Sequence, residues 1–292
     1  MEFLRKEKGS RPVVAICYDF DKTLSPDDMQ SQGLIQDLGL SIEDFWRLSN
    51  ALADENAMDR NLAYMYQILK HGRFTRDIFA SYGSRVSFFP GVTDWFGRIR
   101  AYGHALGLTV EHYIISSGLE EMIAGSSIAH EFEKIYASSF FYDEKGYACW
   151  PAQAINYTGK TQFLFRIEKG CLDSNDPFVN VHLPSDKLRV PFRNFLYIGD
   201  SDTDIPCMRL ITKNGGHSIG VYDPQTEDKS KVYAMRRQER IRYFVPADYR
   251  PSSPLDQLVK QILTQTAAFE QLEQQAIQNA KESAQALSSP TP

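Results

Sequence analysis

The stretch VVAICYDFDKT, Val13–Thr23, decides how this chain folds. Its first six residues are apolar and rich in β-branched side chains, a pattern typical of a strand buried in a sheet. Asp19 and Asp21 follow where this strand is expected to end. Burying two carboxylates beside a core strand costs free energy unless a cation or hydrogen bonds compensate them. The pair therefore indicates a functional site at this position. Asp also serves as a helix N-cap or turn residue, so the pair alone leaves both interpretations open.

Two later apolar runs also end in polar residues. The run HYIISSG, 112–118, ends in small hydroxyl residues, and FLYIGDSDTD, 195–204, ends in clustered carboxylates. Lys160 stands between them, just before a helix expected over 161–169. Strands alternating with helices predict an α/β fold, a Rossmann-like parallel sheet with right-handed crossovers. Since ligands bind at the carboxyl ends of such strands, we expect these distant polar residues to meet in one crevice.

A long helical block separates the first two of these strands. Apolar residues recur at helical spacing from residue 27 to about 85, and Ser41 with Asp44 marks one helix start. The block is too long for a simple crossover, so it predicts an inserted α-helical cap domain over 25–102. The core domain is then discontinuous, 1–24 and 103–292. Its remaining expected strands are 135–137, 218–222 and 242–245, with a hairpin over 140–150.

The end of the chain has a different composition. An amphipathic helix is expected from Leu255, and the Gln/Ala-rich residues 271–292 are expected to form a frayed tail. The helix either docks on the core or mediates self-association into a homo-oligomer, and the sequence leaves both open.

Composition excludes several classes of protein. Of the 292 residues, 42% are hydrophobic and 24% charged, as in an ordinary globular protein, and the net charge is −5. This charge disfavours a nucleic-acid partner. There is no apolar stretch long enough for a membrane span and no apolar secretion signal near the N-terminus, so a cytoplasmic location is expected. The four cysteines are scattered, and Cys17 and Cys207 are expected to be core residues.

The polar segments follow one another in an order that resembles the motif order of a known protein family. An Asp pair, a Ser, a Lys and a Gly-Asp-x3-Asp run resemble the four motifs of the haloacid dehalogenase-like (HAD) hydrolase superfamily, over about two hundred residues. The chain looks most like the phosphoserine-phosphatase-type branch, in which a helical C1 cap lies between the first and second motifs. The resemblance implies hydrolysis of a phosphate monoester.

The resemblance also implies roles for the carboxylates. Asp19 matches the nucleophile, which forms an aspartyl-phosphate. Asp21 matches the general acid and base, which requires a raised pKa. Mg²⁺ is the implied cofactor, with the Asp19 carboxylate, the main-chain carbonyl of Asp21 and Asp200 as ligands. Asp204, one helical turn beyond Asp200, is expected to support the metal or Lys160, whereas Asp202 is expected to be a solvated loop residue.

Other residues match the phosphate-binding part of the pattern. Ser116 is expected to hydrogen-bond a phosphoryl oxygen, with Ser117 as the alternative, and Ser117 and Gly118 can add main-chain N–H donors. Lys160 is expected to supply positive charge to the phosphoryl group and to keep Asp19 ionised.

Three positions bear on the substrate. Lys22 replaces a usual Gly or Ser and is expected either at the active-site rim or in water. The cap stretch 62–66, LAYMY, lacks the basic residues that grip a substrate carboxylate, which disfavours phosphoserine. Asp28 matches an acidic position near the cap hinge that can bind a substrate amine, although an N-cap role is slightly preferred.

The sequence therefore predicts a Mg²⁺-dependent phosphatase acting on a small phosphorylated metabolite, since a cap that closes excludes macromolecules. A phosphotransferase using the same intermediate, or a non-catalytic phosphoester-binding protein, is the alternative. A dinucleotide-binding enzyme is disfavoured because no G-x-G-x-x-G follows the first strand.

Overall fold

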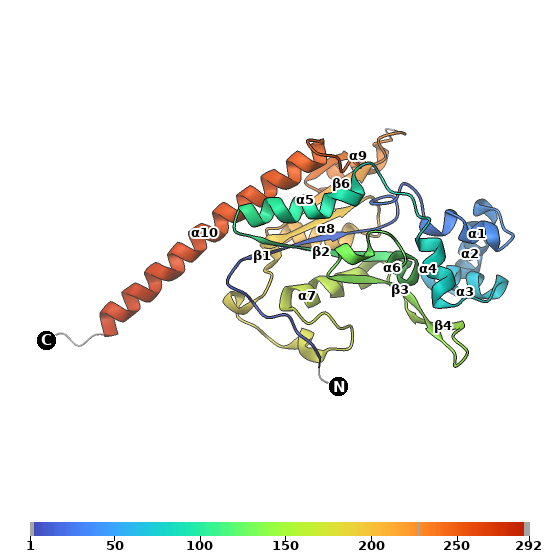
Figure 1. Cartoon of the computed structure of the whole chain (residues 1–292), viewed down its shortest axis with the longest axis horizontal. Coiled ribbons are helices and arrows are strands. Elements are labelled where there is room, and N and C mark those ends of the chain that lie inside the picture. Colours follow the sequence, from blue (N-terminus) through green and yellow to red (C-terminus); the bar gives the residue numbers. More distant parts are fainter. Residues whose placement is uncertain (1–2, 227, 289–292) are drawn as a thin grey trace.

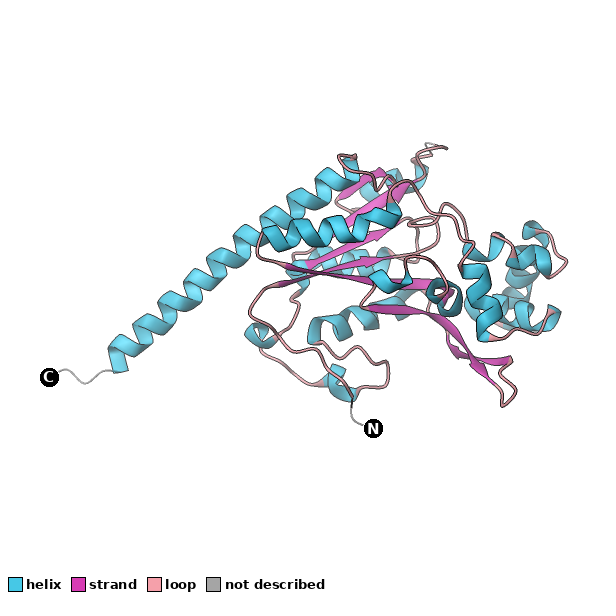
Figure 2. Ribbon diagram, viewed as in Figure 1, coloured by secondary structure: helices cyan, strands magenta, loops and turns pink. Residues whose placement is uncertain are grey.

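The computed structural model of this chain describes residues 3–226 and 228–288. These residues form a seven-stranded sheet in the order β4-β3-β2-β1-β5-β6-β7, flanked by helices (Figures 1 and 2). All neighbouring strands are parallel except β3 and β4, which form an antiparallel hairpin. The predicted α/β fold with a parallel sheet is thus confirmed. The strands are β1 (Val13–Tyr18), β2 (Thr109–Leu119), β3 (Lys134–Tyr142), β4 (Ala148–Gln153), β5 (Phe195–Gly199), β6 (His217–Tyr222) and β7 (Tyr243–Pro246).

Strand β1 lies at the centre of the sheet, paired with β2 on one side and β5 on the other. All six of its residues are buried, which explains why its sequence is continuously apolar rather than alternating. Val14 and Ile16 contribute to the hydrophobic core on one face of the sheet, and Ala15 and Cys17 to the core on the opposite face. The two faces are therefore covered by different helices.

Helices α5 and α10 cover one face and α7 and α8 the other (Figure 1). The helices are α1 (Leu34–Asp37), α2 (Ile42–Asn56), α3 (Arg60–His71), α4 (Arg76–Gly83), α5 (Val92–Ala105), α6 (Glu120–Ala124), α7 (Thr161–Lys169), α8 (Ile205–Lys213), α9 (Ser230–Arg237) and α10 (Pro254–Ser288). Short 3₁₀ segments are η1 (Met29–Ser31), η2 (Ala129–Glu131), η3 (Tyr157–Lys160), η4 (Pro177–Asn180), η5 (Ser185–Lys187) and η6 (Phe192–Asn194).

The helices α1–α4, inserted between β1 and β2, gather beyond the carboxyl ends of the central strands (Figure 1). The predicted start of α2 is correct, because the Ser41 side chain accepts a hydrogen bond from the Asp44 N–H. Helix α5 begins inside the expected cap range of 25–102 and ends beyond it, and it packs against β2 and α10 of the core. The inserted helices outside the core are therefore α1–α4, and of these α2 and α3 contribute residues to the cavity described below.

Helix α10 is longer than the sequence indicated. Leu255, Val259 and Leu263 in its first half are buried, whereas Leu272 further along is 71% exposed. The helix continues to Ser288 and extends away from the body, so residues 271–288 are helical where a frayed tail was expected (Figure 1). Ala, Gln, Glu and Lys are strong helix formers, which accounts for the difference. Residues 289–292 of that tail lie outside the described residues, and self-association through α10 stays a prediction.

Two expectations from composition can be compared with the structure. Within residues 3–226 and 228–288, no helix combines the length and the apolar character that crossing a membrane requires. Cys17 and Cys207 are unpaired and fully buried, which confirms them as core residues.

Candidate active site

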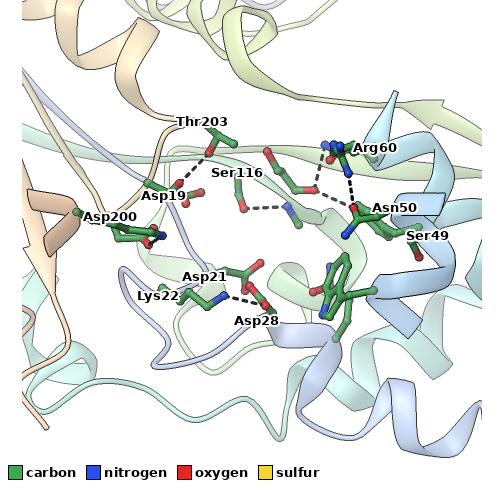
Figure 3. Close-up of a pocket in the computed structure, with 18 residues that line it drawn as sticks. Asp19, Asp21, Lys22, Asp28, Ser49, Asn50, Arg60, Ser116, Asp200 and Thr203 are labelled. Carbon is green, nitrogen blue, oxygen red and sulfur yellow. Dashed lines mark hydrogen bonds and ion pairs between the residues drawn. The ribbon is translucent and has the colours of Figure 1, made fainter. Parts of the chain in front are cut away.

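The site lies at the carboxyl edge of the three central strands, β2, β1 and β5. Because these strands are neighbours and parallel, Ser116 near the end of β2, Asp19 after β1 and Asp200 after β5 meet at one edge. They face a cavity of about 250 Å³ between the sheet and the cap (Figure 3). The crevice predicted from three sequence-distant segments is present.

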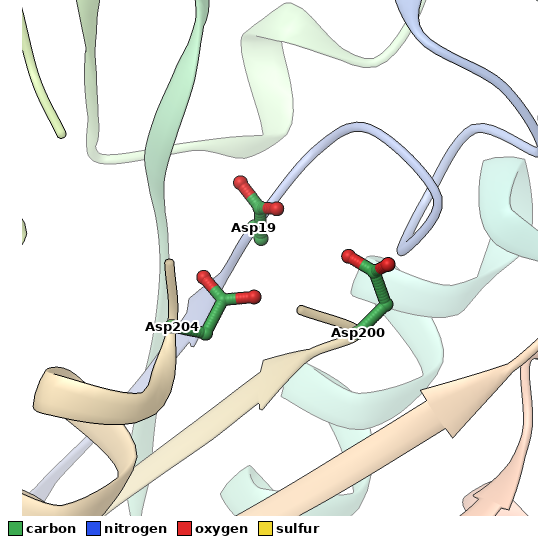
Figure 4. Close-up of side chains that lie close together, drawn as sticks. All are labelled: Asp19, Asp200 and Asp204. Carbon is green, nitrogen blue, oxygen red and sulfur yellow. The ribbon is translucent and has the colours of Figure 1, made fainter. Parts of the chain in front are cut away.

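Three buried carboxylates lie close together at this edge of the sheet. Asp19, Asp200 and Asp204 each offer an oxygen within 4.8 Å of the others (Figure 4). Burial and the neighbouring Asp204 raise the pKa of Asp19 to about 6, against the lowering effect of Lys160. Burial, Asp204 and Asp19 raise the pKa of Asp200 to about 8. Burial and mutual repulsion therefore both disfavour full ionisation of this cluster.

This donor set fits the divalent cation that the family pattern implies. Carboxylate oxygens are hard ligands of the kind that Mg²⁺ takes, and a cation would counter the burial and the repulsion that raise both pKa values. Asp19 and Asp200 line the cavity, so their oxygens are accessible from it. The Asp21 main-chain carbonyl as a further ligand stays a prediction.

Lys160 is the buried cation of the site. It ends η3, its side chain is fully buried, and its Nζ lies 3.1 Å from Asp19 Oδ1 and 2.8 Å from Asp204 Oδ1. Burial acts to lower the pKa of Lys160, but Asp19 and Asp204 raise it above its usual value. Lys160 is therefore charged, and its buried ammonium group forms an ion pair with Asp19.

Asp204 accepts hydrogen bonds from several donors. Besides Lys160, the Tyr197 hydroxyl donates to it at 2.9 Å and the Ser201 N–H at 3.2 Å. With its oxygens occupied in this way, Asp204 is suited to orient Lys160 more than to bind a metal. Gly199 makes room for it, because a Cβ at position 199 would lie 2.5 Å from Asp204 Oδ2. Asp202, by contrast, is exposed, as expected for a solvated loop residue.

Asp21 lines the cavity beside Asp19 and has the environment of a proton donor. Burial, Asp28 and Asp19 raise its pKa well above the usual value. Its Oδ1 accepts the Met29 N–H at 2.8 Å, which fixes the carboxyl group against the start of η1. Gly118 lies close by, since a Cβ there would clash with Met29 Cε and lie 3.1 Å from Asp21 Oδ2.

Both candidate serines line the cavity, together with Gly118. Ser116 is 1% exposed, and its Oγ accepts the Gly118 N–H at 3.0 Å. The Ser117 Oγ is buried and has no hydrogen-bond partner among the described residues.

Lys22 and Asp28 form an ion pair at the rim. Their charged groups lie 2.9 Å apart, and both residues line the cavity (Figure 3). Asp28 stands at the N-cap position of η1, the preferred expectation, but its side chain makes no capping hydrogen bond, and its carboxylate pairs with Lys22. Lys22 belongs to the rim, one of its two expected positions.

Several residues that line the cavity are not among those predicted from the sequence. Arg60 of α3 is a cap cation that lines the cavity, two positions before the stretch 62–66 that lacks basic residues. The signal was Asp59, whose side chain accepts the Asn61 N–H and so marks the start of α3 at Arg60. The missed lining residues are Gln30, Trp46, Ser49, Asn50, Arg60, Asn61, Tyr64, Ser201, Thr203 and Lys231.

Comparison with known protein families identifies the family of this chain. The model of the haloacid dehalogenase-like hydrolase family matches residues 16–209, about two thirds of the chain. The chain belongs to the haloacid dehalogenase-like hydrolase family. This confirms the predicted superfamily and the class of enzyme, a hydrolase.

The chain is also similar to one relative and to two solved structures. An uncharacterized protein of Borreliella burgdorferi (strain ATCC 35210 / DSM 4680 / CIP 102532 / B31) is 27% identical over 279 residues, covering 83% of this chain and 94% of that protein. A HAD family hydrolase of Salmonella enterica serovar Typhi has a TM-score of 0.57 at 16% identity, covering 87% of this chain and 73% of that one. A phosphoserine phosphatase, solved as a phospho-aspartyl intermediate analogue, has a TM-score of 0.51 at 12% identity, with 86% and 99% covered. These structures share the fold of the predicted branch.

Proposed function

We propose that this protein is a Mg²⁺-dependent phosphatase that hydrolyses a small phosphorylated metabolite through an aspartyl-phosphate at Asp19. The observation that carries the proposal is the contact of the buried Lys160 ammonium with Asp19, 3.1 Å away, beside Asp200 at the open edge of the sheet. A buried carboxylate held by a cation and facing a cavity is suited to act as a nucleophile.

The first half-reaction needs a nucleophile and an acid. An Asp19 carboxylate oxygen attacks phosphorus, while the bond from phosphorus to the ester oxygen breaks. Asp21 donates its proton to that departing oxygen, and its raised pKa lets it hold this proton near neutral pH. Lys160 and Ser116 stabilise the charge on the phosphoryl oxygens.

The second half-reaction reverses the role of Asp21. The carboxylate of Asp21 accepts a proton from water, whose oxygen attacks phosphorus and releases inorganic phosphate from Asp19. Mg²⁺, held by Asp19 and Asp200, would supply positive charge beside the phosphoryl group in both halves.

The cap favours a small substrate. Tyr64 of α3 donates a hydrogen bond to the main-chain oxygen of Ser117 at 2.8 Å, and the Asn61 side chain donates to that of Ile155 at 2.5 Å. These contacts hold the cap against the end of β2 and the segment after β4. A cavity of about 250 Å³ under it accommodates a phosphate with a small alcohol.

The test is turnover of p-nitrophenyl phosphate with and without Mg²⁺. We expect Mg²⁺-dependent hydrolysis by the wild type and a loss of at least about a thousandfold in kcat for Asp19→Asn. Asp202→Asn is the matched control, since Asp202 is exposed on the neighbouring loop. Equal rates for the wild type and Asp19→Asn would contradict the proposal. Products formed with added alcohols distinguish a phosphatase from a phosphotransferase.

A further inference from the structure

Three residues that line the cavity contain buried polar atoms that have no hydrogen-bond partner among the described residues. Gln30 lines the cavity and is only 2% exposed, and its Oε1 has no hydrogen-bond partner among the described residues. The Trp46 Nε1 and the Ser117 Oγ, which line the same cavity, are also buried and without a partner in that part of the chain. Leaving such groups unpaired costs free energy, so they indicate a ligand that completes their hydrogen bonds.

These three groups differ in the hydrogen bonds that they can form. Gln30 Oε1 accepts a hydrogen bond, the Trp46 N–H donates one, and the Ser117 hydroxyl does either. Trp46 is held in place by edge-to-face contacts with Phe45 and Tyr64, with ring centroids 5.1 and 6.0 Å apart. The ligand must therefore both donate and accept at fixed positions. Alcohol hydroxyls do both.

The cationic side chains that line the cavity, Lys22, Arg60 and Lys231, already have carboxylate partners. Lys22 pairs with Asp28 at 2.9 Å, and Lys231 lies 3.7 Å from Asp200. Arg60 pairs with Asp54 at 3.0 Å and donates to Asn50 Oδ1 at 2.6 Å. A substrate carboxylate or ammonium would compete with one of these partly exposed pairs, whereas a hydroxyl would not.

We propose that the substrate is a phosphate monoester of a small uncharged polyol, a glycerol- or sugar-like alcohol, whose hydroxyls bind Gln30, Trp46 and Ser117. This inference rests on the proposed phosphatase function and narrows its substrate class. The phosphoryl group lies against Asp19, and the alcohol extends under the cap toward α2 and η1. Gln30 and Trp46 are then specificity-determining residues.

The first experiment compares leaving groups with and without charge, in the presence of Mg²⁺. Glycerol 3-phosphate and ribose 5-phosphate are measured beside 3-phosphoglycerate and phosphoserine. We expect kcat/KM for the polyol esters to exceed that for the charged esters by at least about tenfold. A charged ester that matches or exceeds both polyol esters would overturn the proposal.

The second experiment uses variants of the proposed contacts. We expect Gln30→Leu to lower the ratio of kcat/KM for glycerol 3-phosphate to that for p-nitrophenyl phosphate by about tenfold, the effect of one lost hydrogen bond. Trp46→Phe, which keeps an aromatic ring but deletes the N–H, is expected to lower the same ratio. Gln162→Leu, an exposed position on α7, is the matched control. Unchanged ratios in both cavity variants would refute the assignment.

The two proposals fail in distinguishable ways. If the wild type does not hydrolyse p-nitrophenyl phosphate, the phosphatase function fails. If it does so through Asp19 but prefers charged esters, only the polyol assignment fails.

Discussion

Lys160 Nζ lies 2.8 Å from Asp204 Oδ1, and both side chains are completely buried. This pair positions the cation that in turn holds Asp19, 3.1 Å from the same Nζ. Asp204 comes from the loop after β5 and Lys160 from the end of η3, so the contact links two distant segments of the chain.

Asp204→Asn separates a positioning role from metal binding. If Asp204 orients Lys160, the variant lowers kcat by about 10- to 100-fold, as loss of a supporting partner does, while the Mg²⁺ concentration for half-maximal activity changes little. Asp200→Asn provides the comparison, because it removes an expected ligand and should raise that concentration strongly. A Mg²⁺ requirement raised equally in both variants would make Asp204 a ligand.

The variant Gly199→Ala tests whether Asp204 must keep its position beside Gly199. The added Cβ would lie 2.5 Å from Asp204 Oδ2 and 2.7 Å from its Cγ, so this carboxylate must move. We expect kcat to fall at least about tenfold and the free energy of unfolding to fall by about 1–3 kcal/mol, the usual cost of overpacking. Gly159→Ala is the control, since a Cβ there meets nothing within 4 Å. Wild-type kcat in Gly199→Ala would show that the position of Asp204 is not critical.

The metal-free protein should become less stable as the pH rises toward 8. The pKa of Asp200 is raised to about 8 by burial, Asp204 and Asp19, whereas an unfolded Asp titrates near 4. Between these values the folded state binds a proton that the unfolded state lacks. The free energy of unfolding then decreases with pH by up to about 1.4 kcal/mol per unit.

Chemical denaturation at several pH values, with EDTA or with Mg²⁺, measures this effect. Mg²⁺ should raise stability most at high pH, and Asp200→Asn should flatten the metal-free dependence. The prediction would be contradicted if the free energy of unfolding of the metal-free wild type, relative to that of Asp200→Asn, stayed constant or rose between about pH 6 and pH 8.

A buried ion pair anchors the loop before β5. Arg189 donates two hydrogen bonds to Glu111 of β2, at 2.8 and 2.6 Å. Burial acts to raise the pKa of Glu111, but Arg189, Tyr113 and Lys6 together lower it to about 2. We expect Arg189→Met to lower the free energy of unfolding at neutral pH by about 3 kcal/mol, because it leaves a buried carboxylate poorly paired.

The sign of the pH dependence follows from the lowered pKa of Glu111. Its stabilising contribution is complete above about pH 4.5 and is lost as the pH falls toward 2, so the difference between wild type and Arg189→Met should shrink in that range. Arg209→Met, at an exposed position on α8, is the control. A difference that is constant with pH would exclude Glu111 as the group responsible.

Much of the site could be predicted because it follows from strand ends. The buried strand before Asp19 and the one before Asp200 are continuous apolar runs, and parallel neighbours bring their ends together. Ordered motifs along the chain then identified Lys160, whose burial no local pattern indicates. The expected contacts of Lys160 with Asp19 and of Asp204 with Lys160 are both present.

The cap residues could not be predicted in the same way. Arg60, Trp46 and Gln30 lie on three different elements, and only the packing of those elements brings them to one cavity. Gln30 in particular has no sequence signal, since a buried glutamine without a partner looks like any polar loop residue. The helical extension beyond residue 271 was missed for another reason: its polar composition suits a solvated helix as well as a tail.

The most direct test of the central claim is the location of the phosphoryl group on the enzyme. Asp21→Asn slows attack by water more than it slows transfer from p-nitrophenyl phosphate, whose leaving group needs no acid, so the intermediate should accumulate. Acid-quenched protein is digested and analysed by mass spectrometry. A hydroxylamine-sensitive phosphoryl group on Asp19, absent from the Asp19→Asn/Asp21→Asn double variant, is the expected result. A phosphoryl group on another residue, or hydrolysis with none on the enzyme, would contradict the mechanism.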